Sequence, residues 1–443
     1  MRIPKSPPSL DKLMSDALAA SDPAAVLSLL GRIPSDRRYL HWDKLLRLPA
    51  PDGLTHAQWW LGLKFSRRAQ ARYLPLMGKD GRPFSCALPD PIPEQLNDID
   101  LRAGGSIGMS VPIANPSMKN RYLINSLIEE AITSSQLEGA ATTRRVAKEM
   151  IRTGRPPRDR SEQMILNNYL AMQEIGKIRK DPITPDFVVH LHRTVTHDTL
   201  DKPGDAGRFR RSDEQIDVGD NYGQVFHQPP PADQLQKRMA AMCDFANGKT
   251  PENFVHPVLR SIILHFWLAY DHPFVDGNGR AARALFYWSM LHYGYWICEF
   301  ISISEIIRKA PAQYGTAFLY TETDDNDLTY FILYHLDVIR RAVDQLNEYV
   351  KRKTNELQML ERKMRALALL NHRQQALISH ALRNPHQAYT IDSHSLSHKV
   401  VYQTARSDLL DLAKRGVLQA KKVGKQWRFT PSPDIEERLR SSD

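Results

Sequence analysis

HPFVDGNGRAAR (residues 272–283) joins two strongly apolar runs of the chain. The run before it is RSIILHFWLAY and the run after it is ALFYWSMLHYGYW, and both have the composition of buried helices. A glycine-rich turn between two such helices leaves backbone N–H groups facing a common point, and the start of the second helix adds a partial positive charge there. The stretch therefore predicts an anion-binding turn inside a helical core.

The side chains of this turn are those that a polyphosphate and its metal ion require. Arg280 and Arg283 lie three residues apart at the start of the second helix, where both can reach one polyphosphate. Asp276 offers the hard oxygen ligand that Mg²⁺ prefers. His272 is mostly neutral at pH 7 with an ordinary imidazole pKa of about 6.5, so it can accept a proton from a hydroxyl. Taken singly, each residue also fits a purely structural role at a helix–helix turn.

The turn is not a P-loop, because no strand precedes it and the Gly-Lys-Ser/Thr ending is absent. Residues 272–283 instead match without a gap the signature H-x-F-x-[DE]-G-N-G-R-x-x-R, and on these residues the chain resembles the Fic-domain family. The resemblance implies an α-helical core that transfers AMP from ATP to a hydroxyl side chain of a target protein, or of the enzyme itself. The variation of the signature found in Doc-type kinases is absent, which disfavours phosphoryl transfer.

The resemblance also implies a role for each position of the motif. His272 would be the general base that deprotonates a target Ser, Thr or Tyr, and Asp276 would hold Mg²⁺ or Mn²⁺ against the α- and β-phosphates. Arg280 would hold the β-phosphate side and Arg283 would grip the γ-phosphate. Tyr314 lies near the place where the family has an aromatic side chain beside adenine, with core packing as the alternative. The anion hole would come from Gly277, Asn278 and Gly279.

A second short motif lies upstream, in NRYLINSLIEEAITSSQLEGA (residues 120–140). Its apolar spacing predicts a helix, with Glu138 near the end and four residues after Ser134, hence on the same side. A carboxylate near a buried face needs a partner, and an arginine of the phosphate site would supply it. Ser134, Glu138 and Gly139 also match the inhibitory [ST]-x-x-x-E-[GN] motif of Fic proteins. The resemblance implies that Glu138 pairs with Arg283 and inhibits the enzyme, and that it can also serve AMP removal; an exposed helix face is the alternative.

The motifs fall in a predicted Fic domain of residues 116–335. Before it, residues 1–115 are expected to form a helical extension that includes a helix over HAQWWLGLKFSRRAQARYL (residues 56–74). After it, apolar residues four and three apart, without Gly or Pro, predict a connecting helix over residues 336–370. Its apolar face either packs on its own protein or forms a coiled-coil homodimer.

A short β-hairpin is expected ahead of the central motif. Ile216, Asp217 and Val218 belong to a segment that alternates around a Gly-containing turn and stops at the prolines 229–231. In Fic proteins a hairpin flap at this place registers the target segment, and a strand edge does this through main-chain hydrogen bonds. The alternative is a structural hairpin that only covers the core.

Residues 371–443 have the pattern of a small winged helix-turn-helix domain. Two helical segments, LNHRQQALISHALR and VYQTARSDLLDLAKRGV, precede LQAKKVGKQWRFTPS, which alternates like a two-stranded ribbon. Phosphate contacts from its basic residues would give salt-sensitive DNA affinity, although winged helices also dock proteins. The candidate DNA contacts are Gln403, Thr404, Arg406 and Lys425.

Composition fits a globular protein without a membrane span. The chain has 443 residues, of which 42% are hydrophobic and 25% charged, and its longest apolar run is too short to cross a bilayer. Three distant cysteines suggest reduced thiols in the cytoplasm, and the net charge of +10 suggests an anionic partner. The sequence thus predicts a mainly α protein that acts as an autoinhibited protein adenylyltransferase on an unknown target. A nucleotide-sensing, DNA-binding transcriptional regulator is the alternative.

Overall fold

The computed structural model is mainly helical, with small sheets of two or three strands, which confirms the predicted fold class. It divides into two units, Met1–Asn347 and Glu348–Asp443. None of the described helices has both the length and the hydropathy of a membrane span. The expected domain boundary near residue 115 and the candidate contact Lys425 lie outside the described residues. The residues that the structure describes are 2–20, 26, 38–104, 116–214, 216–220, 222–368, 370–383, 387–423 and 426–432.

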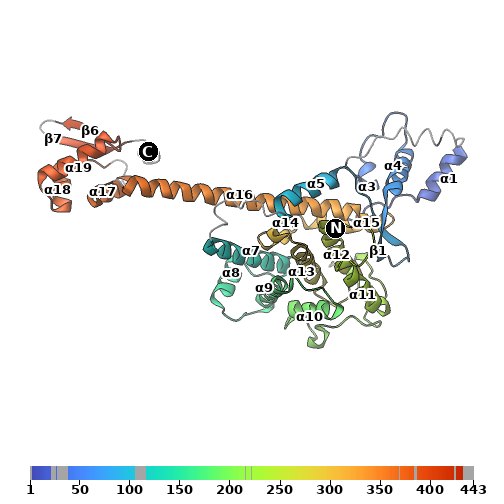
Figure 1. Ribbon diagram of the computed structural model, residues 1–443. Coiled ribbons are helices and arrows are strands. Elements are labelled where there is room, and N and C mark those ends of the chain that lie inside the picture. The colour runs from blue at the N-terminus through green and yellow to red at the C-terminus, as the bar shows by residue number, and fades with distance from the viewer. Residues whose placement is uncertain are drawn as a thin grey trace. The chain divides into compact units, whose positions relative to one another are not determined.

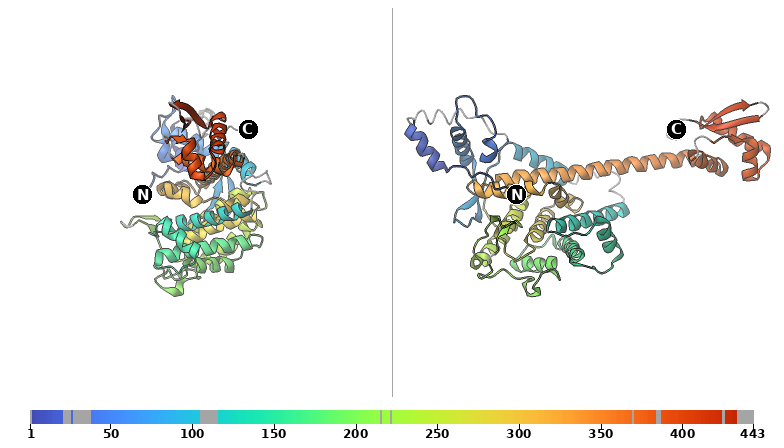
Figure 2. Two further views of the ribbon diagram at one scale, coloured as in Figure 1. Left: turned by 90° about the vertical axis from the view of Figure 1, so that its left-hand side faces the viewer. Right: turned by 180° about the vertical axis from the view of Figure 1, so that it is seen from behind.

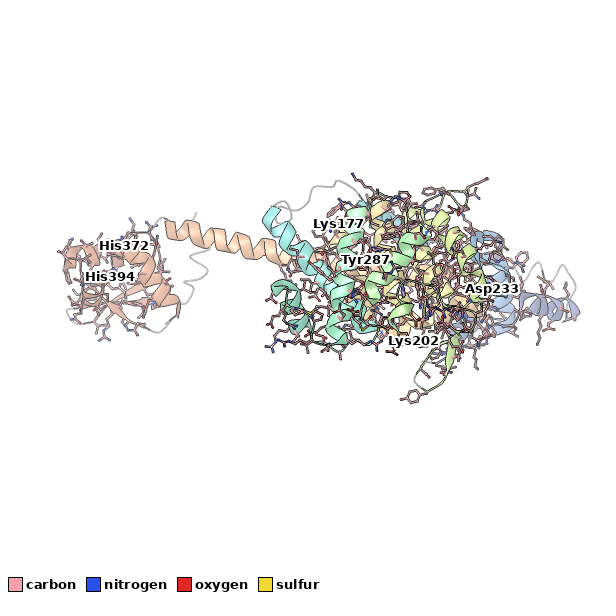
Figure 3. The ribbon with its side chains drawn as sticks, turned by 90° about the horizontal axis from the view of Figure 1, so that it is seen from below. Lys177, Lys202, Asp233, Tyr287, His372 and His394 are labelled. Atoms are coloured by element: carbon pink, nitrogen blue, oxygen red, sulfur yellow. The ribbon has the colours of Figure 1, made fainter. Side chains whose placement is uncertain are left out.

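The two apolar runs form the central helix pair of the first unit, α12 (Pro257–Asp271) and α13 (Asn278–His292) (Figure 1). Nearly every residue of both helices is buried, as expected for helices that are apolar all round. Tyr287 of α13 lies deep among the surrounding side chains (Figure 3), where its hydroxyl donates to Glu130 at 2.9 Å. The helices packed around the pair include α7 (Pro116–Leu137), α9 (Arg160–Ile178), α10 (Pro185–Thr196) and α11 (Leu235–Ala246).

Shorter elements complete the first unit. Strands β3 (Val218–Gly219) and β4 (Val225–His227) pair antiparallel, which confirms the predicted hairpin before the central motif. The remaining elements are α1 (Leu10–Ala20), α3 (Trp42–Leu45), α5 (Pro91–Ile99), the π-helix Asp100–Gly104, α8 (Arg144–Thr153), α14 (Ile303–Lys309), α15 (Pro311–Thr323) and the 3₁₀ turns Pro203–Asp205, Ala232–Gln234 and Trp296–Glu299.

The helix expected over residues 56–74 is too long, and this prediction was wrong at its end. Helix α4 (His56–Gln70) stops at Gln70, and β1 (Arg72–Met77) follows and pairs antiparallel with β2 (Pro83–Cys86). Pro75 removes a backbone donor and cannot sit inside a helix. Along β1, Leu74 and Leu76 are buried while the side chains between and beside them are more exposed, which is the alternation of a strand.

A buried ion pair and several hydrogen bonds connect these N-terminal elements to the loop that follows α15. Lys64 Nζ of α4 lies 2.7 Å from the fully buried carboxylate of Asp324. The hydroxyl of Tyr330 donates to the same carboxylate at 2.7 Å, and the hydroxyl of Tyr39 donates to Asp327 at 2.7 Å. Ser85 of β2 adds two main-chain hydrogen bonds to this loop. The end of α15 is therefore held by residues far away in the sequence.

Replacing Lys64 with methionine is expected to destabilise the protein by about 3 kcal/mol, because the buried Asp324 carboxylate loses its charge partner. The measurement is the urea midpoint of the full chain, followed by tryptophan fluorescence. Lys309→Met is the matched control, since Lys309 Nζ lies 3.6 Å from Glu305 at a partly exposed surface and such a pair contributes at most about 1 kcal/mol. Equal midpoint shifts for the two variants would contradict the prediction.

Helix α16 (Thr329–Ala368) begins in the first unit and crosses the division between the two. Leu336, Ile339 and Val343 of its predicted apolar face are buried in the first unit. For these residues, packing within the chain accounts for the spacing of three and four residues.

The second unit contains helices and a three-stranded antiparallel sheet of order β5-β7-β6 (Figures 1 and 2). The core of this unit is apolar. Asp408 is buried beside the core, where its carboxylate accepts from Arg373 Nε at 2.7 Å and lies 3.3 Å from His394 Nε2. The elements are α17 (His372–Arg383), β5 (Tyr389–Thr390), α18 (Ile391–His398), α19 (Tyr402–Lys414), β6 (Leu418–Val423) and β7 (Gln426–Pro431).

Candidate active site

The glycine-rich turn is closed by its own side chains. His272 ends α12 with φ 43° and ψ 57°, a left-handed conformation, and its N–H donates to Leu268 O at 3.0 Å. The amide of Asn278 then bridges the backbone of Phe274, accepting from its N–H at 2.9 Å and donating to its carbonyl at 2.8 Å. Gly277 has φ 84°, and a Cβ there would lie 2.6 Å from the side chain of Thr196. The turn therefore needs glycine at this position for both conformation and space.

His192, which the sequence analysis did not identify, packs against the turn. The ring of His192 stacks on buried Phe274, with centroids 3.7 Å apart and planes at 4°. Gly207 N–H donates to Nδ1 of His192 at 3.0 Å, so Nε2 carries the proton and donates to Asp276 O at 2.8 Å. Burial lowers the pKa of His192 to about 4, which keeps the ring neutral for this role. A histidine within an otherwise ordinary helix gives no sequence signal for such a contact.

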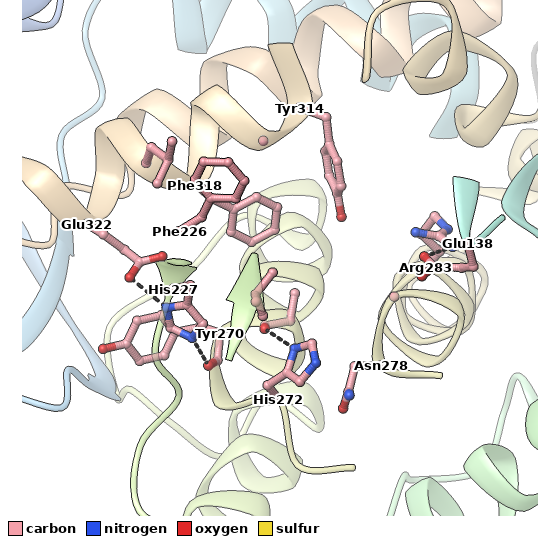
Figure 4. Close-up of a pocket in the computed structure, with 15 residues that line it drawn as sticks. Glu138, Phe226, His227, Tyr270, His272, Asn278, Arg283, Tyr314, Phe318 and Glu322 are labelled. Atoms are coloured by element: carbon pink, nitrogen blue, oxygen red, sulfur yellow. Dashed lines mark hydrogen bonds and ion pairs between the residues drawn. The ribbon is translucent and has the colours of Figure 1, made fainter. Parts of the chain in front are cut away.

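The turn opens into a cavity of about 230 Å³ in the first unit (Figure 4). Helices α12, α13 and α15, the β3–β4 hairpin and the end of α7 all contribute to its wall. The sequence-predicted residues that line it are Glu138, Val218, His272, Asn278, Gly279, Arg283 and Tyr314. The lining residues that were not predicted are Phe226, His227, Ala269, Tyr270, Gly315, Phe318, Leu319 and Glu322.

His272 lies in this wall with one ring nitrogen available. Burial, followed by the neighbouring His227, lowers the pKa of His272 to about 4, so the ring is unprotonated at neutral pH. Nδ1 faces Ala269 O at 3.4 Å, a long hydrogen bond that this nitrogen donates and that leaves Nε2 as the basic atom. Arg210 fixes the backbone beside it, since its Nε donates to His272 O at 2.9 Å and its Nη2 to Pro230 O. Nε2 of His272 therefore has its lone pair available to accept a proton, and the backbone of the residue is held in place by Arg210.

Arg283 is engaged by the end of α7. Its Nε donates to Ser134 Oγ at 2.8 Å, and its Nη2 donates to Ser134 O at 3.0 Å and to Glu138 Oε1 at 2.8 Å. The arginine side chain is 2% exposed, while that of Glu138 is 27% exposed. The two motif residues, four apart, thus bind one guanidinium together. Gly139, with φ 92°, ends this segment in the left-handed region.

The Glu138 carboxylate also lies against the first turn of α13. A Cβ built on Gly279 would be 2.1 Å from Glu138 Oε1, so only glycine leaves room for the carboxylate here. The N-terminus of a helix attracts anions through its unpaired N–H groups and its dipole. Glu138 therefore occupies part of the space in which an anionic ligand of this turn would bind.

Arg280 and Asp276 lie beside the cavity and are absent from its wall among the described residues. Arg280 is 1% exposed, donates from Nη1 to Val195 O at 2.7 Å, and lies 3.7 Å from Asp276 Oδ2. Asp276 accepts from Gly277 N–H at 2.6 Å, and its side chain is 45% exposed. Within the described part of the chain, no three His, Cys, Asp or Glu side chains gather into a metal site of their own. A cation here would need ligands from a bound phosphate.

The opposite wall is built from α15 and the hairpin. Tyr314, Phe318 and Glu322 are spaced four apart, which places them on one face of α15. Once Tyr314 is assigned to the cavity, the spacing of four residues also predicts Phe318 and Glu322 as cavity residues. The Tyr314 hydroxyl lies 2.9 Å from His265 Nε2. His227 connects the hairpin to α15 and to α12. Its Nδ1 lies 2.7 Å from Glu322 Oε2, and its Nε2 lies 2.7 Å from Tyr270 O.

The hairpin residues differ in their positions. Val218 begins β3 and lines the cavity, whereas Ile216 and Asp217 precede the strand and are not among the lining residues. The candidate DNA contacts belong to the second unit. Gln403 and Arg406 are exposed on the first turns of α19, and Thr404 between them is partly buried.

Comparison with known proteins agrees with this geometry. Residues 182–290, which contain α10 to α12 and most of α13, match the sequence model of the Fic/DOC family. The chain therefore contains a Fic domain. It is similar to the protein adenylyltransferase Fic of Nematostella vectensis, with 31% identity over 182 residues, or 40% of each chain. The protein of the same name from Drosophila willistoni is 34% identical over 133 residues, covering 30% of this chain and 24% of the relative.

The chain thus spans well under half the length of these curated relatives. Among solved structures, it is similar to a Fic family protein from Desulfovibrio desulfuricans G20. That similarity has 19% sequence identity and a TM-score of 0.48, and it covers 77% of this chain and 94% of that chain.

Proposed function

We propose that this chain is a protein adenylyltransferase, which transfers AMP from ATP to a Ser, Thr or Tyr hydroxyl of a target protein and of itself. The observation that carries the proposal is the position of His272, whose unprotonated ring shares one cavity wall with the glycine-rich start of α13. The curated relatives support it, since both are named protein adenylyltransferases.

The residues of the cavity fit each part of this reaction. The target hydroxyl oxygen attacks the α-phosphorus of ATP, the bond from that phosphorus to the bridging oxygen of the β-phosphate breaks, and pyrophosphate leaves. His272 accepts the hydroxyl proton at Nε2. The first N–H groups of α13 and the guanidinium of Arg283 stabilise the phosphate charge. The apolar wall around Phe226 and Phe318 suits the adenine ring, and the hairpin edge at Val218 aligns the target backbone.

We assign Mg²⁺ or Mn²⁺ to Asp276. A single protein carboxylate suits this ion, because Mg²⁺ is usually bound by one or two carboxylates together with substrate phosphates. The Asp276 side chain is 45% exposed, and its Oδ2 lies 3.7 Å from Arg280 and 3.8 Å from Arg160, so a bound cation would share this carboxylate with the two arginines. When bound, the ion would neutralise phosphate charge. Arg280 supports this carboxylate from the buried side.

We further propose that Glu138 inhibits the enzyme in the conformation described here. Its carboxylate takes both the guanidinium of Arg283 and the space at Gly279 that a γ-phosphate would use. The cavity of about 230 Å³ is also smaller than the roughly 300–1,000 Å³ of ordinary small-molecule sites. The same carboxylate can activate a water molecule, so AMP removal belongs to the proposal as a second direction of the chemistry.

The assay that tests the proposed activity compares two forms of labelled ATP on the full chain. Label on the α-phosphorus should become covalently attached to protein, whereas label on the γ-phosphorus should not, because it leaves with pyrophosphate. Attachment of γ-label would indicate phosphoryl transfer and would overturn the proposal. Mass spectrometry of modified lysate proteins then identifies the target.

A second candidate function is DNA binding by residues 387–432, and the surface of the second unit favours it. Lys421 of β6 and Arg428 of β7 face each other in the sheet register and are both exposed. Gln403 and Arg406 are exposed at the start of α19. Basic strands beside an exposed helix start suit phosphate and base contacts, as in a winged helix.

The DNA-binding candidate predicts retention of duplex DNA that weakens steeply with salt and survives His272→Ala. Arg428→Glu should abolish this retention, while Lys177→Glu in the first unit should leave it unchanged. Retention that is independent of Arg428 would contradict DNA binding by this surface. Cytoplasmic location and homodimer formation stay predictions from the sequence.

A further inference from the structure

The first unit contains a second, larger cavity on the other side of α15. It has a volume of about 570 Å³, which lies within the usual range for small-molecule sites of roughly 300–1,000 Å³. Residues 38–44, α15 and the start of α16 form its wall. Gln313, Thr316 and Tyr320 line it, whereas Tyr314 and Phe318 of the same helix line the candidate active site.

Aromatic rings make up much of this wall. His41 and Tyr320 stack with centroids 4.2 Å apart and planes at 11°, and Tyr330 meets both edge-on at 5.4 and 5.7 Å. Tyr39 and Tyr334 add two further rings. A wall of fixed rings offers flat surfaces against which a planar aromatic ligand packs, in offset or edge-on contact. Thr316 and Gln313 add polar groups that can orient such a ligand.

The charge of the wall is positive. Arg38 and Lys44 line the cavity, and the wall contains no Asp or Glu among the described residues. Lys44 Nζ lies 5.5 Å from the centre of the Tyr320 ring, so the cation is next to the aromatic surface. Asp43 and Asp324 are the carboxylates that act electrostatically on His41. Each is already in an ion pair, Asp43 with Arg47 at 2.5 Å and Asp324 with Lys64 at 2.7 Å. They therefore do little to offset the positive charge.

We infer that this cavity is a second binding site, separate from the candidate active site, for a planar aromatic anion of nucleotide size. The rings bind the planar part and Lys44 binds the anionic part. A proline-rich peptide is the other class of ligand that aromatic grooves accept, but such a peptide needs no positive wall. A nucleoside monophosphate combines the two required features in one molecule.

The walls of the two cavities share α15 and are also connected by a contact between aromatic rings. The ring of Tyr314, in the wall of the candidate active site, lies 6.2 Å from the ring of Tyr334, in the wall of the second cavity. The inference itself concerns binding and does not depend on catalytic activity. A chain that fails to transfer AMP would still be expected to bind the ligand here.

The test is a binding titration of the full chain with AMP carrying a fluorescent N-methylanthraniloyl group. Glu138→Gly, which frees the candidate active site, is the reference chain; it should bind two molecules of probe, and the variants that follow are made in it. Thr316→Trp fills the second cavity and should leave only the probe bound in the candidate active site. Gly279→Trp fills the candidate active site and should leave only the probe bound in the second cavity. Circular dichroism checks that each variant is folded.

Lys44→Glu gives a second test at an exposed position that carries little risk of unfolding. It should weaken the binding that remains in Gly279→Trp by about fivefold, because a rim cation becomes an anion. The matched control is Lys237→Glu, an exposed charge reversal on α11 away from both cavities. The inference is overturned if Thr316→Trp retains both binding events, if Gly279→Trp abolishes all binding, or if a proline-rich peptide binds where AMP does not.

Discussion

Alanine in place of His272 is expected to lower AMP transfer by a factor of about 10²–10⁴, the range that a positioned general base contributes. The reason is that Nε2 of His272 is the unprotonated nitrogen in the cavity wall, and its pKa of about 4 keeps it so at neutral pH. The measurement is the rate of α-label transfer, made in a Glu138→Gly background so that the reference rate is high.

The matched control is His190→Ala. His190 is half-exposed on α10 and pairs with Glu174 at 2.7 Å, so its removal should leave the transfer rate unchanged. ATP binding should also persist in His272→Ala, since phosphate contacts come from α13 and Arg283. Full transfer activity in folded His272→Ala would remove the basis of the proposed function.

Glycine in place of Glu138 is expected to raise AMP transfer at least about tenfold. The substitution frees the Arg283 guanidinium and the space at Gly279, both of which the carboxylate now occupies. A close charge pair with one fully buried partner is expected to carry about 1.4 kcal/mol of coupling or more, which corresponds to tenfold in an equilibrium. The measurement is self-modification and lysate modification with α-labelled ATP.

Glu138→Gln separates loss of charge from added backbone freedom. The amide keeps the size of the carboxylate but loses the ion pair, so we expect activation smaller than in Glu138→Gly. Double substitution with Arg283→Ala should return the rate to a low value, because the γ-phosphate then lacks its partner. Equal rates for Glu138→Gly and the unchanged chain would reject inhibition by this residue.

Local sequence patterns predicted the parts of the site that lie close together in the chain. The turn of residues 272–283 and the pair of apolar helices around it follow from composition and glycine spacing. The contact between Glu138 and Arg283 joins residues 145 positions apart, and the family motif indicated it. For the β1–β2 hairpin a signal is present in the sequence, since Pro75 disfavours a helix and Leu74 and Leu76 alternate with more polar neighbours, but the predicted helix extends through Leu74 into β1.

The remaining parts depend on contacts that no local pattern carries. His192 contacts Gly207 and Asp276, and these three residues come from three different segments. The N-terminal elements reach the loop after α15 through Lys64 and Asp324, which are 260 residues apart. Such side chains resemble ordinary core or surface residues until the tertiary fold brings their partners together.

Glu138 and Arg283 belong to one polypeptide, so the carboxylate that faces the guanidinium cannot diffuse away. A tethered group of this kind has an effective concentration of the order of millimolar or more. Cellular changes in ATP level are therefore a weak means of displacing it. Under the proposed inhibition, activation requires the Glu138 carboxylate to leave the Arg283 guanidinium through a movement of the chain at the end of α7.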